Sequence, residues 1–134
     1  MRKLTKAVSV AAAVAMTATC FSTTAFADDT FKIGGIGPIT GGAAVYGQAV
    51  MNASQMAADD INAEGGINGY QIEFNFQDDE HDAEKSVNAY NTLKDWGMQM
   101  LLGTVTSTPC TAVEGEASND NRFLLTPSGS AVES

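Results

Sequence analysis

The chain has 134 residues, of which 44% are hydrophobic and 17% are charged, the balance of one globular domain rather than of a disordered or fibrous chain. Seven Lys and Arg residues against sixteen Asp and Glu residues give a formal net charge of -9, so the basic surface that nucleic acid or an anionic membrane requires is missing. Cys20 and Cys110 are too few for a disulfide-stapled scaffold, and no Cys/His spacing typical of a metal site occurs.

Residues 1–27 have the three parts of a secretory signal peptide. Residues 2–6 carry three positive charges, residues 7–18 are small and apolar, and Ala25-Phe26-Ala27 matches an A-x-A cleavage pattern. The apolar run is shorter than the ~20 residues of a membrane-spanning helix. We therefore predict cleavage after Ala27 and export of residues 28–134 to the periplasm or the extracellular surface.

The two cysteines fall on opposite sides of the predicted cleavage point. A lipid anchor at Cys20 is an alternative to free release, although residues 17–19 lack the large aliphatic residue and the small residue at the usual positions of a lipoprotein signal. Cys110 is the only cysteine of the predicted exported chain, and we expect it to be buried.

Strands and helices alternate along the predicted exported chain. Short apolar or alternating runs predict strands at residues 31–36, 71–76, 98–105 and 123–126. Apolar residues at three- and four-residue steps, together with helix-ending signals, predict helices over residues 43–63, 83–96 and 110–119. Repeated strand-helix units without a tight hairpin require parallel pairing. The predicted fold class is α/β, with flanking helices on a parallel sheet.

The helix limits and buried faces follow from individual residues. Gly65-Gly66 and Gly97 should end the first two helices, because glycine adopts the left-handed conformation without steric cost, and Asp82 is the predicted N-cap of the second. The predicted inner face of the first helix consists of Val45, Ala49, Val50, Ala53, Met56, Ala57 and Ile61. That of the second consists of Ala83, Val87, Tyr90 and Leu93.

The loops after the strands form the candidate functional rim, because ligands of such sheets bind outside the carboxyl ends of the strands. These loops cover residues 37–47, 79–82, 106–109 and 126–130. They contain glycine amides and the neutral hydroxyl groups of Thr40, Tyr46, Thr106, Ser107, Thr108, Thr126, Ser128 and Ser130. Hydroxyls and free amides near helix starts suit a small carboxylate, although each Ser or Thr alone is also a common turn former or cap.

Catalysis and metal binding are not favoured by this rim. A serine nucleophile needs a base, His81 is the only histidine, and no nucleophile-elbow motif surrounds any serine. The acidic run at residues 78–82 matches neither a calcium loop nor a zinc helix, and it is interpreted as a solvated loop capped by Asp82. We expect no catalytic residue, no metal and no cofactor.

The glycine-rich first loop leaves a dinucleotide-binding oxidoreductase as an alternative. Gly35, Gly37 and Gly41 lie between a predicted strand and helix, and acids end the second strand. The glycine spacing is one residue too long, however, and Asp78 lies almost twice as far along as the expected ~20 residues.

Several motifs together resemble the leucine/isoleucine/valine-binding type of ABC-transporter substrate-binding protein, a type I periplasmic binding protein. They are Lys32-Ile33-Gly34, Gly37-Pro38-Ile39-Thr40-Gly41, Tyr46-Gly47, Asp60-Ile61-Asn62-Ala63-Glu64-Gly65-Gly66-Ile67-Asn68-Gly69, Asp78-Asp79, Gly103 and Thr126-Pro127-Ser128-Gly129-Ser130. The resemblance implies two α/β lobes that close on an amino acid. It covers the predicted exported chain, which would form the first part of the N-terminal lobe because family members are well over twice as long.

The resemblance also implies ligand roles for four residues. Ser107 matches the serine that holds the ligand α-carboxylate, Ser128 and Ser130 match positions that hold the carboxylate and ammonium groups, and Tyr46 matches an aromatic residue of the side-chain pocket. In leucine-binding relatives a disulfide joins two rim loops. The matching positions in this chain are His81 and Thr106, so that disulfide is absent.

The resemblance implies a non-enzymatic solute-binding component of an ABC importer. Its expected partners are a small amino acid, with a branched-chain one favoured, or a related amide, and the membrane permease that receives it. The ligand-sensing domain of a receptor shares the implied fold and stays an alternative.

Overall fold

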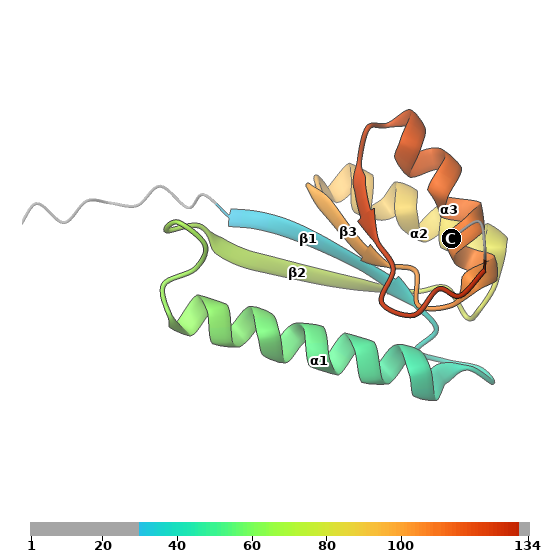
Figure 1. The fold of residues 1–134 in the computed structure, drawn as a ribbon, viewed down its shortest axis with the longest axis horizontal. Helices are drawn as coiled ribbons and strands as arrows, with labels where there is room; N and C mark the ends of the chain where they lie inside the picture. The colour runs from blue at the N-terminus through green and yellow to red at the C-terminus, as the bar shows by residue number, and fades with distance from the viewer. Residues whose placement is uncertain (1–29, 132–134) are drawn as a thin grey trace, which may run out of the picture.

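The computed structural model describes residues 30–131, so the predicted signal peptide and Cys20 lie outside the described part of the chain. Within these residues, four strands and three helices alternate (Figure 1). In chain order they are β1 (Thr30–Gly37), α1 (Ala44–Ala63), β2 (Gln71–Asp78), α2 (Ala83–Trp96), β3 (Met100–Gly103), α3 (Ser107–Asn119) and β4 (Phe123–Leu125).

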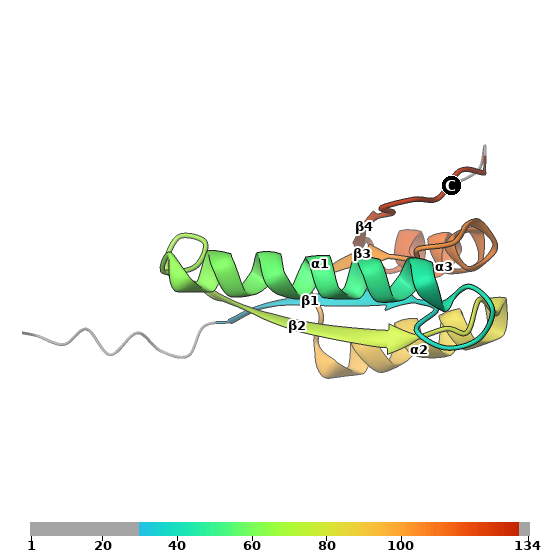
Figure 2. The ribbon, with the colours of Figure 1, turned by 90° about the horizontal axis from the view of Figure 1, so that it is seen from below.

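The four strands form one parallel sheet in the order β2-β1-β3-β4. Helix α1 lies on one face of the sheet and α2 on the other (Figure 2). The prediction of an α/β fold with parallel strands and flanking helices is thereby confirmed. Because parallel strands all end at the same edge of a sheet, the loops that follow them gather there. None of the helices within residues 30–131 has the length and apolar character of a membrane span.

Most helix limits follow the sequence signals. The Asp82 side chain accepts a hydrogen bond from the Lys85 amide at 2.9 Å, and Gly97 caps the end of α2 with φ 91°. Gly65, just beyond α1, is also left-handed with φ 103°. Helix α3 begins earlier than predicted, because Pro109 is accommodated in its first turn, where a missing N–H costs no helical hydrogen bond.

The buried face of α1 agrees with the prediction only in part. Val45 is 68% exposed and Met56 is 66% exposed, whereas the buried positions of this helix are Gly47 and Ala58. A Cβ at Gly47 would lie 1.9 Å from the carbonyl oxygen of Pro38, so the absence of a side chain lets the helix approach the loop before it. Three predicted inner residues, Ala53, Ala57 and Ile61, do line the cavity between α1 and the sheet, so the prediction is confirmed there and wrong at Val45 and Met56.

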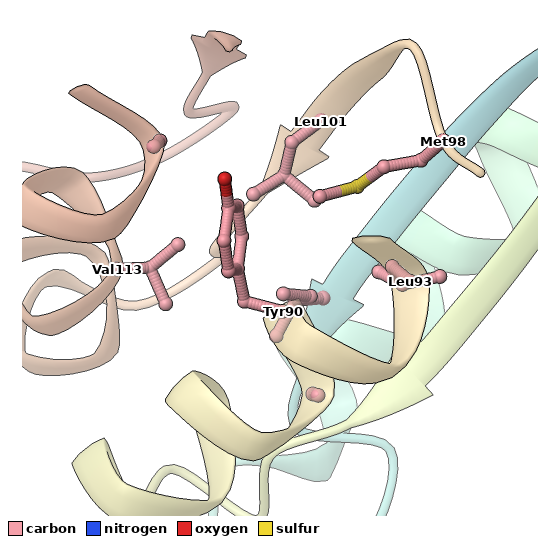
Figure 3. Close-up of a cluster of buried hydrophobic side chains, with 8 residues drawn as sticks. Tyr90, Leu93, Met98, Leu101 and Val113 are labelled. Atoms are coloured by element: carbon pink, nitrogen blue, oxygen red, sulfur yellow. The ribbon is translucent and has the colours of Figure 1, made fainter. Parts of the chain in front are cut away.

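The main hydrophobic core lies between the sheet, α2 and α3. Its largest members are shown in Figure 3: Tyr90 and Leu93 of α2, Met98, Leu101 of β3 and Val113 of α3. Its other members are Ile36, Ala89 and Ala117. The predicted inner positions Tyr90 and Leu93 are confirmed, and Cys110 is buried as predicted.

The other face of the sheet is less covered. Residues from α1 and the strands line an open apolar cavity of about 290 Å³: Ile33, Ala53, Ser54, Ala57, Ala58, Ile61, Ile72, Phe74 and Leu102. Strand β4 is the last in the strand order, and its Phe123 and Leu125 side chains are 62% and 48% exposed.

Candidate ligand-binding site

Asp78, the last residue of β2, holds the loop between β1 and α1 in place by hydrogen bonds. Its Oδ1 accepts hydrogen bonds from the amides of Ile39 at 2.9 Å and Glu80 at 3.0 Å, and a longer one from the Thr40 amide at 3.4 Å. The Thr40 hydroxyl donates to Oδ2 at 2.5 Å. Partial burial acts to raise the pKa of Asp78, but these hydrogen bonds to the charged form outweigh it and lower the pKa below its usual value.

Asp79 is different from its neighbour, because its side chain is fully buried. Oδ1 accepts a hydrogen bond from the His81 amide at 2.9 Å, whereas Oδ2 has no hydrogen-bond partner among residues 30–131. Burial raises the pKa of this carboxyl group above its usual value, since the charged form loses its water. The pKa values of two adjacent acids at the end of β2 are therefore shifted in opposite directions.

His81 connects two of the rim loops. Its Nδ1 lies 2.9 Å from the hydroxyl oxygen of Thr106, the residue that precedes α3. Glu80 and His81 both have positive φ values, 49° and 63°, and the hydrogen bond from the His81 amide to Asp79 closes this turn. The two positions at which the resemblance implied a disulfide in relatives, His81 and Thr106, are thus joined here by a hydrogen bond.

Three of the four predicted ligand residues lie close together. The Ser130 amide donates to the Ser107 hydroxyl oxygen at 3.0 Å, and the hydroxyl oxygens of these serines are 3.5 Å apart. The Ser128 hydroxyl donates to the carbonyl oxygen of Val105 in the same turn. The segment after β4 is thereby held against the start of α3.

The position of Ser107 at the start of α3 gives this cluster its chemical character. The first amides of a helix lack internal partners and carry partial positive charge, and the N-cap Thr106 makes no side-chain hydrogen bond to them. A serine hydroxyl that accepts one hydrogen bond can still donate its own proton. The arrangement can therefore bind a small carboxylate between the Ser107 hydroxyl and the helix amides.

Tyr46 is not joined to this cluster. It lies in the first turn of α1 with 65% of its surface exposed, and no hydrogen bond among the described residues links it to the serines. Its proximity to a bound ligand stays a prediction.

The remaining acids of the rim have structural partners. Glu80 forms an ion pair with Lys85 at 2.6 Å, Asp82 caps α2, and Asp78 binds the loop amides described above. Within residues 30–131 no group of three or more His, Cys, Asp and Glu side chains is placed to hold a metal ion. The role of Asp78 was missed by the sequence analysis, which treated it as part of a solvated loop; an acid at a strand end opposite a Gly-Pro loop is the signal that could have revealed it.

The chain belongs to the periplasmic binding protein family, whose model matches residues 30–134. It is similar to the Leu/Ile/Val-binding protein BraC3 of Rhizobium johnstonii, with 34% identity over 121 residues, which are 88% of this chain and 33% of that protein. It is also similar to the leucine-, isoleucine-, valine-, threonine- and alanine-binding protein of Pseudomonas aeruginosa, with 33% identity over 89% of this chain and 32% of that protein.

The fold agrees with a solved structure of the same kind. The branched-chain amino acid transporter substrate-binding protein LivJ of Streptococcus pneumoniae, in complex with isoleucine, matches with a TM-score of 0.73 and 31% identity over 77% of this chain and 30% of that chain. The chain spans about a third of the length of these relatives. These likenesses support the binding-protein interpretation and not the dinucleotide-binding alternative.

Proposed function

We propose that this chain is the first part of the N-terminal lobe of an extracytoplasmic solute-binding protein that delivers a small amino acid to an ABC-transporter permease. The observation that carries the proposal is the Ser107–Ser130 contact of 3.0 Å at the uncapped start of α3, within a region that matches a periplasmic binding protein over residues 30–134. The relatives named for leucine, isoleucine and valine favour a branched-chain ligand or a related amide.

The proposed roles of the site residues follow from their positions. The Ser107 hydroxyl and the first amides of α3 bind the ligand carboxylate, and Ser128 and Ser130 supply further contacts to the carboxylate and ammonium groups. Tyr46, exposed at the start of α1, lines the pocket for the ligand side chain.

The proposal includes the route and the place of action. Residues 1–27 act as the signal peptide, residues 28–134 belong to the exported lobe, and the protein works in the periplasm or at the extracellular surface. A second lobe closes over the ligand, which buries it and creates the surface that the permease recognises.

Calorimetric titration of the product of the complete reading frame with leucine, isoleucine, valine, acetamide and NAD tests this function. We expect saturable binding of at least one branched-chain amino acid or the amide, and loss of at least tenfold in affinity in Ser107→Ala, since a hydrogen bond to a charged group contributes about 1.5–3 kcal/mol. Ser118→Ala, an exposed serine at the far end of α3, is the matched control and should bind as the unaltered protein does. Binding of NAD alone would refute the proposal.

A further inference from the structure

The N-cap residue of α3 makes no capping hydrogen bond with its side chain. Thr106 is the N-cap residue, and a threonine there normally accepts a hydrogen bond from the second or third amide of the helix. In α3 the third residue is Pro109, which has no N–H, so the Thr108 amide is the one donor that the Thr106 hydroxyl could cap. That capping bond is not formed.

The Thr106 hydroxyl is held by the neighbouring loop instead. Its oxygen lies 2.9 Å from Nδ1 of His81. His81 is itself fixed, because its amide donates to the buried Asp79 carboxylate at 2.9 Å and the following amide, of Asp82, donates to the Asp79 carbonyl oxygen at 2.8 Å. Asp79 therefore fixes the backbone of His81, and from this position the histidine ring holds the Thr106 hydroxyl.

The consequence concerns the amide next to the ligand site. Thr108 follows Ser107, and its N–H has no side-chain cap in the described structure. A free amide at a helix start is a binding group for an anion, whereas an amide bonded to its own N-cap must give up that bond first.

We propose that His81 is a positioning residue of the ligand site, which holds the Thr106 hydroxyl away from α3 and so leaves the Thr108 amide free for the carboxylate of the ligand. The proposal rests on the proposed function, since it deepens the account of the carboxylate-binding group around Ser107. It assigns to His81 no contact with the ligand itself.

The test compares His81→Phe, Thr106→Val and the double variant in the full chain, by calorimetric titration with leucine. His81→Phe keeps a ring of similar size but releases the hydroxyl to cap Thr108, so affinity should fall about fivefold, the value of one N-cap bond. The double variant has no hydroxyl to form that cap, and its affinity should return to that of Thr106→Val. If His81 only supported the fold of the loop, the double variant would bind leucine as weakly as His81→Phe does. This result would overturn the proposal.

A second measurement needs no ligand. Amide hydrogen exchange at Thr108, followed by NMR, should slow in His81→Phe and stay as in the unaltered protein in Thr106→Val. Glu80→Gln, which alters an exposed residue of the same turn, is the control and should leave this exchange unchanged. If the unaltered protein does not bind leucine, the leucine-binding form of the proposed function is refuted; if exchange at Thr108 is the same in His81→Phe, the role of His81 is refuted whether or not leucine binds.

Discussion

Replacement of Asp78 by asparagine tests how the rim loops are held. Three short hydrogen bonds end on this carboxylate, from the Ile39 amide, the Glu80 amide and the Thr40 hydroxyl. Hydrogen bonds to charged groups contribute about 1.5–3 kcal/mol and neutral ones about 0.5–1.5 kcal/mol. Loss of the charge of Asp78 therefore costs roughly 1 kcal/mol of stability for each of these hydrogen bonds that is shielded from water. Because the side chain is only partly buried, water reduces this cost, and we expect Asp78→Asn to lower the free energy of unfolding by about 2 kcal/mol at pH 7.

The pH dependence follows from the direction of the pKa shift. The folded protein lowers the pKa of Asp78, so its stabilisation is present above the unfolded value of about 3.9 and is lost as the pH falls through the folded pKa. Urea unfolding at a series of pH values should therefore show the variant and the unaltered protein converging in acid. Asp82→Asn removes the same charge from the same loop but keeps a good N-cap, and it should change stability by less than about 0.5 kcal/mol. An Asp78→Asn penalty that is absent at pH 7, or constant with pH, would refute the reasoning.

Three further outcomes are expected. Asp79→Asn should show the opposite trend in urea unfolding. Burial raises the pKa of Asp79 in the folded state, so the contribution of Asp79 to the free energy of unfolding is present below about pH 3.9 and is lost as the pH rises through the folded pKa. The variant should therefore gain stability relative to the unaltered protein between acid and neutral pH. Tyr90→Phe should lower the free energy of unfolding by about 1 kcal/mol, because it removes the 2.9 Å hydrogen bond to Asp120. It should also abolish an ultraviolet titration step near pH 12, since burial and that bond raise the pKa of Tyr90 to about 12. Gly47→Ala places a Cβ 1.9 Å from a backbone oxygen and should lower the melting temperature, by an overpacking cost of about 1–3 kcal/mol, whereas Gly115→Ala, which meets nothing within 4 Å, should raise it.

The sequence predicted those parts of the fold that depend on local signals. Asp82 and Gly97 mark the limits of α2 in the structure as in the sequence, since capping depends on a few neighbouring residues. The parallel sheet was predictable because strand-helix repeats without hairpins leave no other pairing. The close approach of α1 to the loop before it was not, because it requires the absence of a side chain at Gly47 beside the carbonyl oxygen of Pro38, nine residues earlier in the chain.

The candidate site was predicted at the level of its location rather than its connections. Ser107, Ser128 and Ser130 follow strands that end at one edge, so their convergence followed from topology, and the structure brings them together. The hydrogen bond between His81 and Thr106 joins residues 25 positions apart through side-chain orientation. Composition and periodicity carry no information about such a contact; only the resemblance, which matched both positions to a disulfide, implied that they lie close together.

Strand β4 lies at an edge of the described sheet, and its exposed apolar side chains affect how the chain associates in solution. This strand has hydrogen-bonded neighbours on one side only within the described sheet, and two of its three side chains, Phe123 and Leu125, are exposed and apolar. An unpaired apolar edge is a template on which a strand of another molecule can add. Residues 30–131 without a covering partner are therefore expected to self-associate through β4 as concentration rises, in a manner that a charge introduced at Phe123 would suppress.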